Sequence, residues 1–80
     1  MLSTGRQLKA ARALAGWDQQ NLADAAGLAV NTVRRLEAAD GPIRANTETL
    51  RKVQGALEAA GVEFIAENGG GPGVRLKAHR

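Results

Sequence analysis

Residues 17–37 read WDQQNLADAAGLAVNTVRRLE, and this stretch decides the fold. Asp18 is placed to cap a helix that we expect over Gln19–Ala26, and Gly27 is placed to end it. A second helix is expected from about Val30 to Ala38. Each helix is too short to be stable alone, so packing has to hold the pair together. The stretch therefore predicts two short helices joined by a tight turn.

The pattern within this stretch fits a helix-turn-helix unit. Ala23 is small where the second helix has to cross closely, and Gly27 suits a left-handed backbone that a side chain would oppose. Val33 and Leu36 are three residues apart and anchor the second helix to the core. The remaining outer surface is polar and cationic, which is typical of a helix that enters the major groove of DNA.

Two more helices flank this unit. Thr4 opens a sequence of the form T-x-x-Q, a capping box, at the start of a helix expected over Gly5–Ala15. Asn46 or Thr47 caps another helix, which Gly61 ends. Apolar residues recur along both helices at helical spacing. The first 61 residues are therefore expected to form one four-helix domain.

A β-hairpin is expected after these helices. Val62–Ile65 is rich in β-formers, and Val74–Lys77 alternates apolar and polar residues. The segment between them, Glu67–Gly73, is turn material. The sequence thus predicts a mainly α fold, with a helix-turn-helix domain over residues 1–61 and a C-terminal β-hairpin with a short tail over residues 62–80.

Composition narrows the classes of function. The net charge of +3 and the isoelectric point of about 10.2 fit a polyanionic partner, although many basic proteins bind none. The chain has no cysteine, so disulfides, thiol chemistry and zinc fingers are excluded. The acidic residues show no catalytic spacing, and the stretch 69–73 lacks the Lys-Ser/Thr of a phosphate-binding loop. We therefore expect no enzyme activity, no cofactor and no metal site.

Targeting signals are also missing from the sequence. No apolar run approaches the roughly 18 residues that span a bilayer, and the N-terminus lacks the apolar core of a signal peptide. We therefore expect no membrane partner and a cytoplasmic location, with association to the nucleoid through DNA.

Residues 17–37 resemble the helix-turn-helix domains of lambdoid phage repressors and Cro proteins, the XRE family, because the small, glycine and apolar positions coincide. The resemblance extends to the flanking helices and covers roughly Thr4–Ala60. It implies a repressor-like fold and a sequence-specific transcriptional regulator that binds double-stranded DNA. Most such proteins are repressors that bind a palindromic operator as homodimers, here through a recognition helix at about 30–38.

The resemblance and side-chain chemistry together indicate the base contacts. Val30, Asn31 and Arg35 match family positions that face base edges. Arg34 and Arg35 can each bind the O6 and N7 atoms of guanine, and Asn31 suits adenine. Val30 either meets a thymine methyl group or packs on the turn.

Other residues are expected to position the protein. Gln19 matches the family glutamine that contacts a phosphate and braces the recognition helix. Thr32 and Arg44 are further candidates for phosphate contacts, which fix position without reading sequence. Arg12 and Glu37 match a pair of positions that the family often fills with an arginine and a glutamate, and we expect a partly buried salt bridge between them.

Two residues depart from the family pattern. The residue before the recognition helix is usually Ser or Thr, a good cap, but here it is Ala29. The glycine usual after the recognition helix is replaced by Ala39, and Gly41 follows two residues later. Because of these departures, the pattern does not fix the residues at which the recognition helix begins and ends.

The hairpin suggests a dimer. A lone hairpin is marginal in water, so it needs the helices or a second copy of itself. We expect the strands to pack against the last helix and to join the same strands of a second subunit. The residues expected at that interface are Val62, Phe64, Ile65, Val74 and Leu76. The alternative is a flexible tail after Gly61.

Two other functions compete with an operator-binding regulator. The first is the antitoxin of a toxin–antitoxin pair, which binds its own operator and a toxin protein. A toxin-wrapping tail is the feature to look for, and the few residues after Leu76 count against it. The second is a protein-interaction adaptor that has lost DNA binding. The exposed set Asn31, Arg34 and Arg35 argues against that reading.

Overall fold

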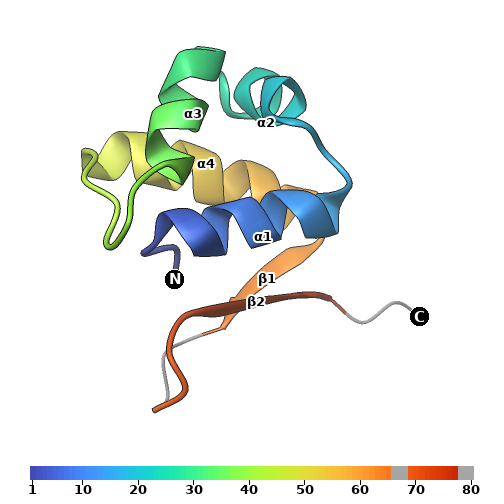
Figure 1. Ribbon diagram of the computed structural model, residues 1–80. Coiled ribbons are helices and arrows are strands. Elements are labelled where there is room, and N and C mark those ends of the chain that lie inside the picture. The colour runs from blue at the N-terminus through green and yellow to red at the C-terminus, as the bar shows by residue number, and fades with distance from the viewer. Residues whose placement is uncertain (66–68, 78–80) are drawn as a thin grey trace.

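The computed structural model describes residues 1–65 and 69–77, so the stretch expected to turn, Glu67–Gly73, lies partly outside the described residues. Within these ranges, helices are followed by one antiparallel hairpin, which confirms the expected mainly α fold (Figure 1). The elements are α1 (Gly5–Ala15), α2 (Gln19–Ala26), α3 (Val30–Glu37), α4 (Thr47–Ala59), β1 (Val62–Ile65) and β2 (Gly73–Leu76).

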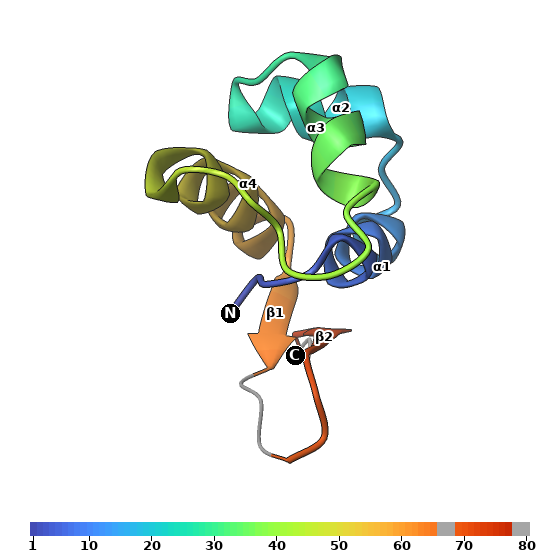
Figure 2. The same cartoon turned by 60° about the vertical axis from the view of Figure 1, so that its left-hand side comes forward.

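The elements form three layers. Figures 1 and 2 show α2 and α3 on one side of α1 and α4, with the hairpin on the other side. α2 contacts both α3 and α4, whereas β1 contacts α4 and β2 contacts α1. The predicted recognition helix and the predicted dimer element therefore lie on opposite sides of the α1–α4 layer.

Side chains cap three of the helices. Thr4 Oγ1 accepts from the amide of Gln7 at 3.0 Å, and Asn46 accepts from the first turn of α4. At α2 the capping is reciprocal, because Asp18 accepts from the Asn21 amide at 2.7 Å and the Asn21 side chain accepts from the Asp18 amide at 3.0 Å. These caps satisfy backbone donors that have no partner within the helix.

The capping box expected at Thr4 is only half formed. The Gln7 side chain accepts from the amide of Ser3 at 2.7 Å and donates to the carbonyls of Met1 and Gly73, both at 3.1 Å. The reason is burial, since the Gln7 side chain is enclosed by its neighbours and meets backbone groups from two distant segments there. Gln7 therefore connects the N-terminal segment, α1 and β2.

The element ends agree with the sequence to within a residue. Gly16 and Gly27 end α1 and α2 in the left-handed conformation, with φ of 74° and 70°. α3 ends at Glu37 and not at Ala38, because Ala38 serves as the C-terminal cap. β2 begins and ends one residue earlier than expected, although Lys77 still donates to the Gly61 carbonyl at 2.8 Å.

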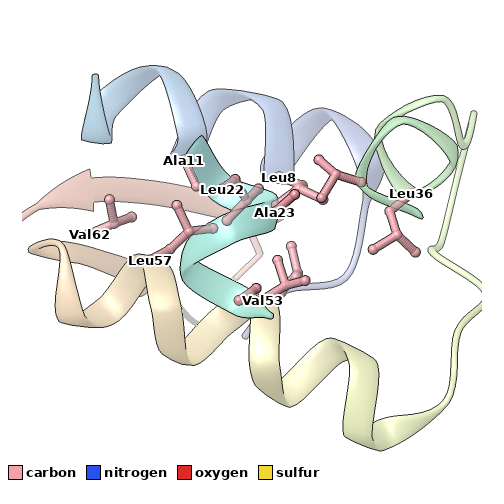
Figure 3. Close-up of a cluster of buried hydrophobic side chains, with 11 residues drawn as sticks. Leu8, Ala11, Leu22, Ala23, Leu36, Val53, Leu57 and Val62 are labelled. Carbon is pink, nitrogen blue, oxygen red and sulfur yellow. The ribbon is translucent and has the colours of Figure 1, made fainter. Parts of the chain in front are cut away.

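The core is built by α1–α4 and β1 together (Figure 3). Its largest fully buried side chains are Leu8, Leu22, Val33, Val53, Leu57 and Val62. The prediction that Val62 contacts a second subunit is wrong, because its side chain has no exposed surface in the single chain. Gly61, with φ of 97°, turns the chain after α4 and directs β1 into the core.

The hairpin uses its two faces differently. Val62 pairs with Leu76 and Phe64 with Val74, so these residues share the face toward the helices, where Phe64 and Val74 pack against the core. Ile65 lies on the opposite face because strand side chains alternate. The single chain already buries Val62 completely, and a dimer contact by the other four residues stays a prediction. Of the five, only Ile65 and Leu76 stay exposed, at 36% and 48%.

Candidate nucleic-acid interface

α3 has one buried and one exposed side. Val33, Leu36 and Glu37 are buried, whereas Asn31, Arg34 and Arg35 are exposed. Buried and exposed residues occupy different sides of α3 because residues three or four positions apart lie on the same side of a helix. The apolar side fixes α3 against the core, so the structure presents three of the four predicted base-reading residues to solvent.

Two of these exposed side chains contact each other. Arg34 Nη1 donates to Asn31 Oδ1 at 3.1 Å, a pairing that the spacing of three residues permits. The bond is exposed, so water or a base edge can replace it at small cost. It orders both side chains on the same side of α3.

Val30 and Thr32 lie at the start of α3 and are half-buried. Val30 packs against the core, and its contact with a thymine methyl group stays a prediction. Ala29 gives no side-chain cap, as its methyl group dictates, so no side chain accepts from the first-turn amides of α3.

Glu37 is the centre of a polar network at the far end of α3. Arg12 Nε donates to Glu37 Oε2 at 2.7 Å, and Arg12 Nη2 donates to Oε1 at 3.1 Å. Gln19 Nε2 also donates to Oε1, at 3.0 Å. Arg12 Nη1 reaches the Trp17 carbonyl at 3.0 Å. The network joins α1, the start of α2 and the end of α3, and it contains the salt bridge expected from the resemblance.

The network is shielded from water. The side chain of Glu37 is 2% exposed and that of Arg12 is 19% exposed. The hydrogen bond to Glu37 raises the pKa of Arg12 above its ordinary value, so the guanidinium stays charged. Gln19 thus has the bracing contact that the resemblance implies, and a phosphate contact by it stays a prediction.

Arg35 and Arg44 come together at the end of α3. Both border a pocket of about 520 Å³, which Leu36, Asp40 and Ile43 also line. Both arginines are exposed. The loop between α3 and α4 therefore brings a second cation next to α3, with the Asp40 carboxylate close by.

Sequence reasoning missed a close contact between α1 and α3. A Cβ atom on Gly5 would lie 2.8 Å from each of the carbonyl oxygens of Leu36, Glu37 and Ala39. Only glycine allows this approach. The contact fixes the end of α3 against the start of α1. The local sequence around Gly5 is typical of any helix start, so it does not indicate the contact with α3.

Residues 1–65 and 69–77 contain no group of three or more metal-ligating side chains. Among the same residues, no helix has the length and apolarity that crossing a bilayer requires.

Comparison with known proteins agrees with this geometry. The chain matches the helix-turn-helix family HTH_3 over residues 8–62, which is more than half of its length. No curated protein matches the chain in a sequence search. The matched region contains α2, α3 and the Arg12–Glu37 network. The chain therefore belongs to the XRE-type helix-turn-helix family of DNA-binding transcriptional regulators.

Proposed function

We propose that this chain is a sequence-specific repressor that binds a palindromic operator as a homodimer, with α3 as the recognition helix. One observation carries the proposal. Asn31, Arg34 and Arg35 are exposed on a helix whose other side is fixed by the core and by the network around Glu37. A fixed helix is needed because hydrogen bonds to bases tolerate little displacement.

In this proposal, the base contacts come from four residues of α3. Arg35 binds the O6 and N7 atoms of guanine, and Arg34 binds a guanine or a phosphate. Asn31 binds adenine after exchanging its bond to Arg34. Val30, at the start of α3, contacts a thymine methyl group with the part of its surface that the core leaves free.

Phosphate contacts position the helix in the groove. Gln19 begins α2 and Thr32 lies in the first turn of α3, and both are half-buried. Arg44 is exposed and lines the same pocket as Arg35. Their polar groups can bind the DNA backbone on either side of the recognition helix. Since each phosphate contact releases counterions, binding should weaken as salt increases.

The proposed dimer uses the hairpin. The described sheet has two strands, so each strand keeps an outer edge with backbone donors and acceptors. Ile65 and Leu76 remain exposed beside these edges. A two-fold dimer presents two copies of α3 to two half-sites, which makes the operator palindromic, and occupying the operator is enough to block transcription.

Selection from a random duplex library at one stated salt concentration tests the base contacts. We expect a motif with two half-sites. The variant Arg35→Ala should relax the preference at one position per half-site and weaken binding by about 1–3 kcal/mol. Arg51→Ala removes an exposed arginine from α4 and is the matched control. Salt-dependent binding without a motif would contradict sequence reading and direct the search to a protein partner.

Light scattering after size-exclusion chromatography tests the dimer. The full chain should have the mass of a dimer, and Leu76→Glu should have the mass of a monomer because a charge replaces an exposed apolar contact. Leu14→Glu, at an exposed leucine of α1, is the control. A dimer that survives Leu76→Glu and Ile65→Glu together would place the interface elsewhere.

A further inference from the structure

A cavity of about 580 Å³ lies between α1, the loop after α3 and β2. Side chains from all three segments line it, among them Thr4, Arg6, Ala10, Asp40, Pro72 and Val74. Its volume falls within the range of about 300–1,000 Å³ that is usual for pockets binding small molecules. The cavity is separate from the exposed side of α3, and DNA binding gives it no role.

The cavity shares a wall with the candidate nucleic-acid interface. Ala39, Asp40 and Gly41 line this cavity, and they also line the pocket beside Arg35 and Arg44. The same loop continues directly from α3. A molecule bound in the cavity therefore presses on a segment whose other side carries the proposed DNA contacts.

Two exposed side chains of opposite charge line the cavity and favour one class of ligand. Arg6 comes from α1 and Asp40 from the loop, and in the described part of the chain neither forms an ion pair. A carboxylate suits the guanidinium fork of Arg6, and an ammonium group suits the carboxylate of Asp40. The Asp40 carboxylate would repel a purely anionic ligand, and the Arg6 guanidinium would repel a purely cationic one. The rest of the lining is mostly small and apolar, as with Ala10 and Val74.

We propose that this cavity binds a small zwitterion, an amino acid or a close relative with one amine, one carboxylate and a compact apolar frame. We further propose that the bound zwitterion changes the affinity of the protein for DNA through the loop 39–41. This second part rests on the proposed operator binding, whereas the first part does not. The zwitterion joins two walls of the cavity, so its binding fixes the loop relative to α1.

Thermal unfolding without DNA tests the binding site. The probes are the standard L-amino acids, β-alanine and γ-aminobutyrate, with propionate and propylamine as ligands of single charge. At least one zwitterion should raise Tm in proportion to the logarithm of its concentration. The shift should be lost in Arg6→Ala and Asp40→Asn. It should persist in Lys9→Ala and Asp24→Asn, which alter exposed charges outside the cavity lining.

The unfolding result can overturn the site in three ways. No shift with any zwitterion, as expected if a second subunit fills the cavity, would overturn it. A shift retained in both cavity variants would place binding elsewhere. An equal shift with propionate or propylamine would remove the zwitterion as the ligand class.

DNA binding by the full chain then tests regulation. Affinity for the selected duplex is measured with and without the zwitterion that raises Tm, and a change of about 5–150-fold is expected for coupled sites. Unchanged affinity would overturn the regulatory part and leave the binding site standing. Failure to select any duplex would overturn the operator proposal alone, since the unfolding assay contains no DNA.

Discussion

Two ion pairs in the described part of the chain have the same shortest distance but different surroundings. Arg12 Nε lies 2.7 Å from Glu37, and Arg75 Nε lies 2.7 Å from Glu63. The Glu37 side chain is 2% exposed and accepts three hydrogen bonds, whereas that of Glu63 is 42% exposed on the outer face of the hairpin. Burial decides the cost of losing a partner, so only the first pair should matter for folding.

Removing Arg12 should have the largest effect. Arg12→Met leaves the Glu37 carboxylate buried beside Gln19 alone, and breaking such a pair costs about 3–5 kcal/mol in the free energy of unfolding. Urea unfolding followed by circular dichroism measures it. Arg75→Met, the matched change on the hairpin, should leave the midpoint unchanged.

A second variant keeps this prediction testable if Arg12→Met does not fold. Arg12→Met with Glu37→Met replaces both charges by apolar groups, so no buried charge lacks a partner. The double variant should be more stable than the single one. Equal losses for Arg12→Met and Arg75→Met would contradict the distinction between the two pairs.

Two glycines allow a similar comparison between a buried and an exposed position. Gly5 lies at the close contact between α1 and α3, whereas Gly55 lies on the exposed surface of α4. Gly5→Ala should destabilise the protein by about 1–3 kcal/mol, because the added Cβ meets three backbone carbonyls at 2.8 Å. Gly55→Ala should stabilise it by up to about 1 kcal/mol, because Gly55 lies inside α4 with open space around it. The urea midpoints of both variants show whether each substitution lowers or raises the free energy of unfolding. A stabilising effect of Gly5→Ala would show that the end of α3 can move away from α1 at little cost.

The helices were predictable from the sequence because their signals are local. Asp18 and Gly27 mark ends of α2 through their own backbone chemistry, and the apolar spacing marks the buried sides. The Arg12–Glu37 pair is different, since 25 residues separate its members. Only the family resemblance indicated that pair, and the pattern of the sequence alone did not.

The contacts that sequence reasoning missed are tertiary. Gln7 binds the carbonyl of Gly73, 66 residues away, and no spacing rule relates the two positions. The requirement for glycine at position 5 comes from backbone carbonyls at the end of α3, which leave no room for a Cβ atom. Val62 was assigned to the wrong surface because a strand shows which residues alternate but not which side the core occupies.

The smallest effect is expected at Glu63. Its hydrogen bond with Arg75, and then the charge of Arg75, lower the pKa of Glu63 below its ordinary value of 4.5. A lowered acid pKa means that the pair stabilises the folded state above pH 4.5 and that this contribution is lost as the pH falls through the folded pKa. Because both side chains are exposed, salt screens the pair, and Glu63→Gln should barely change the urea midpoint at neutral pH. That small difference should vanish at acid pH and in high salt. A large difference at neutral pH would show that the outer face of the hairpin is covered in solution, as it would be if the dimer interface included it, and the second ion pair would then behave like the first.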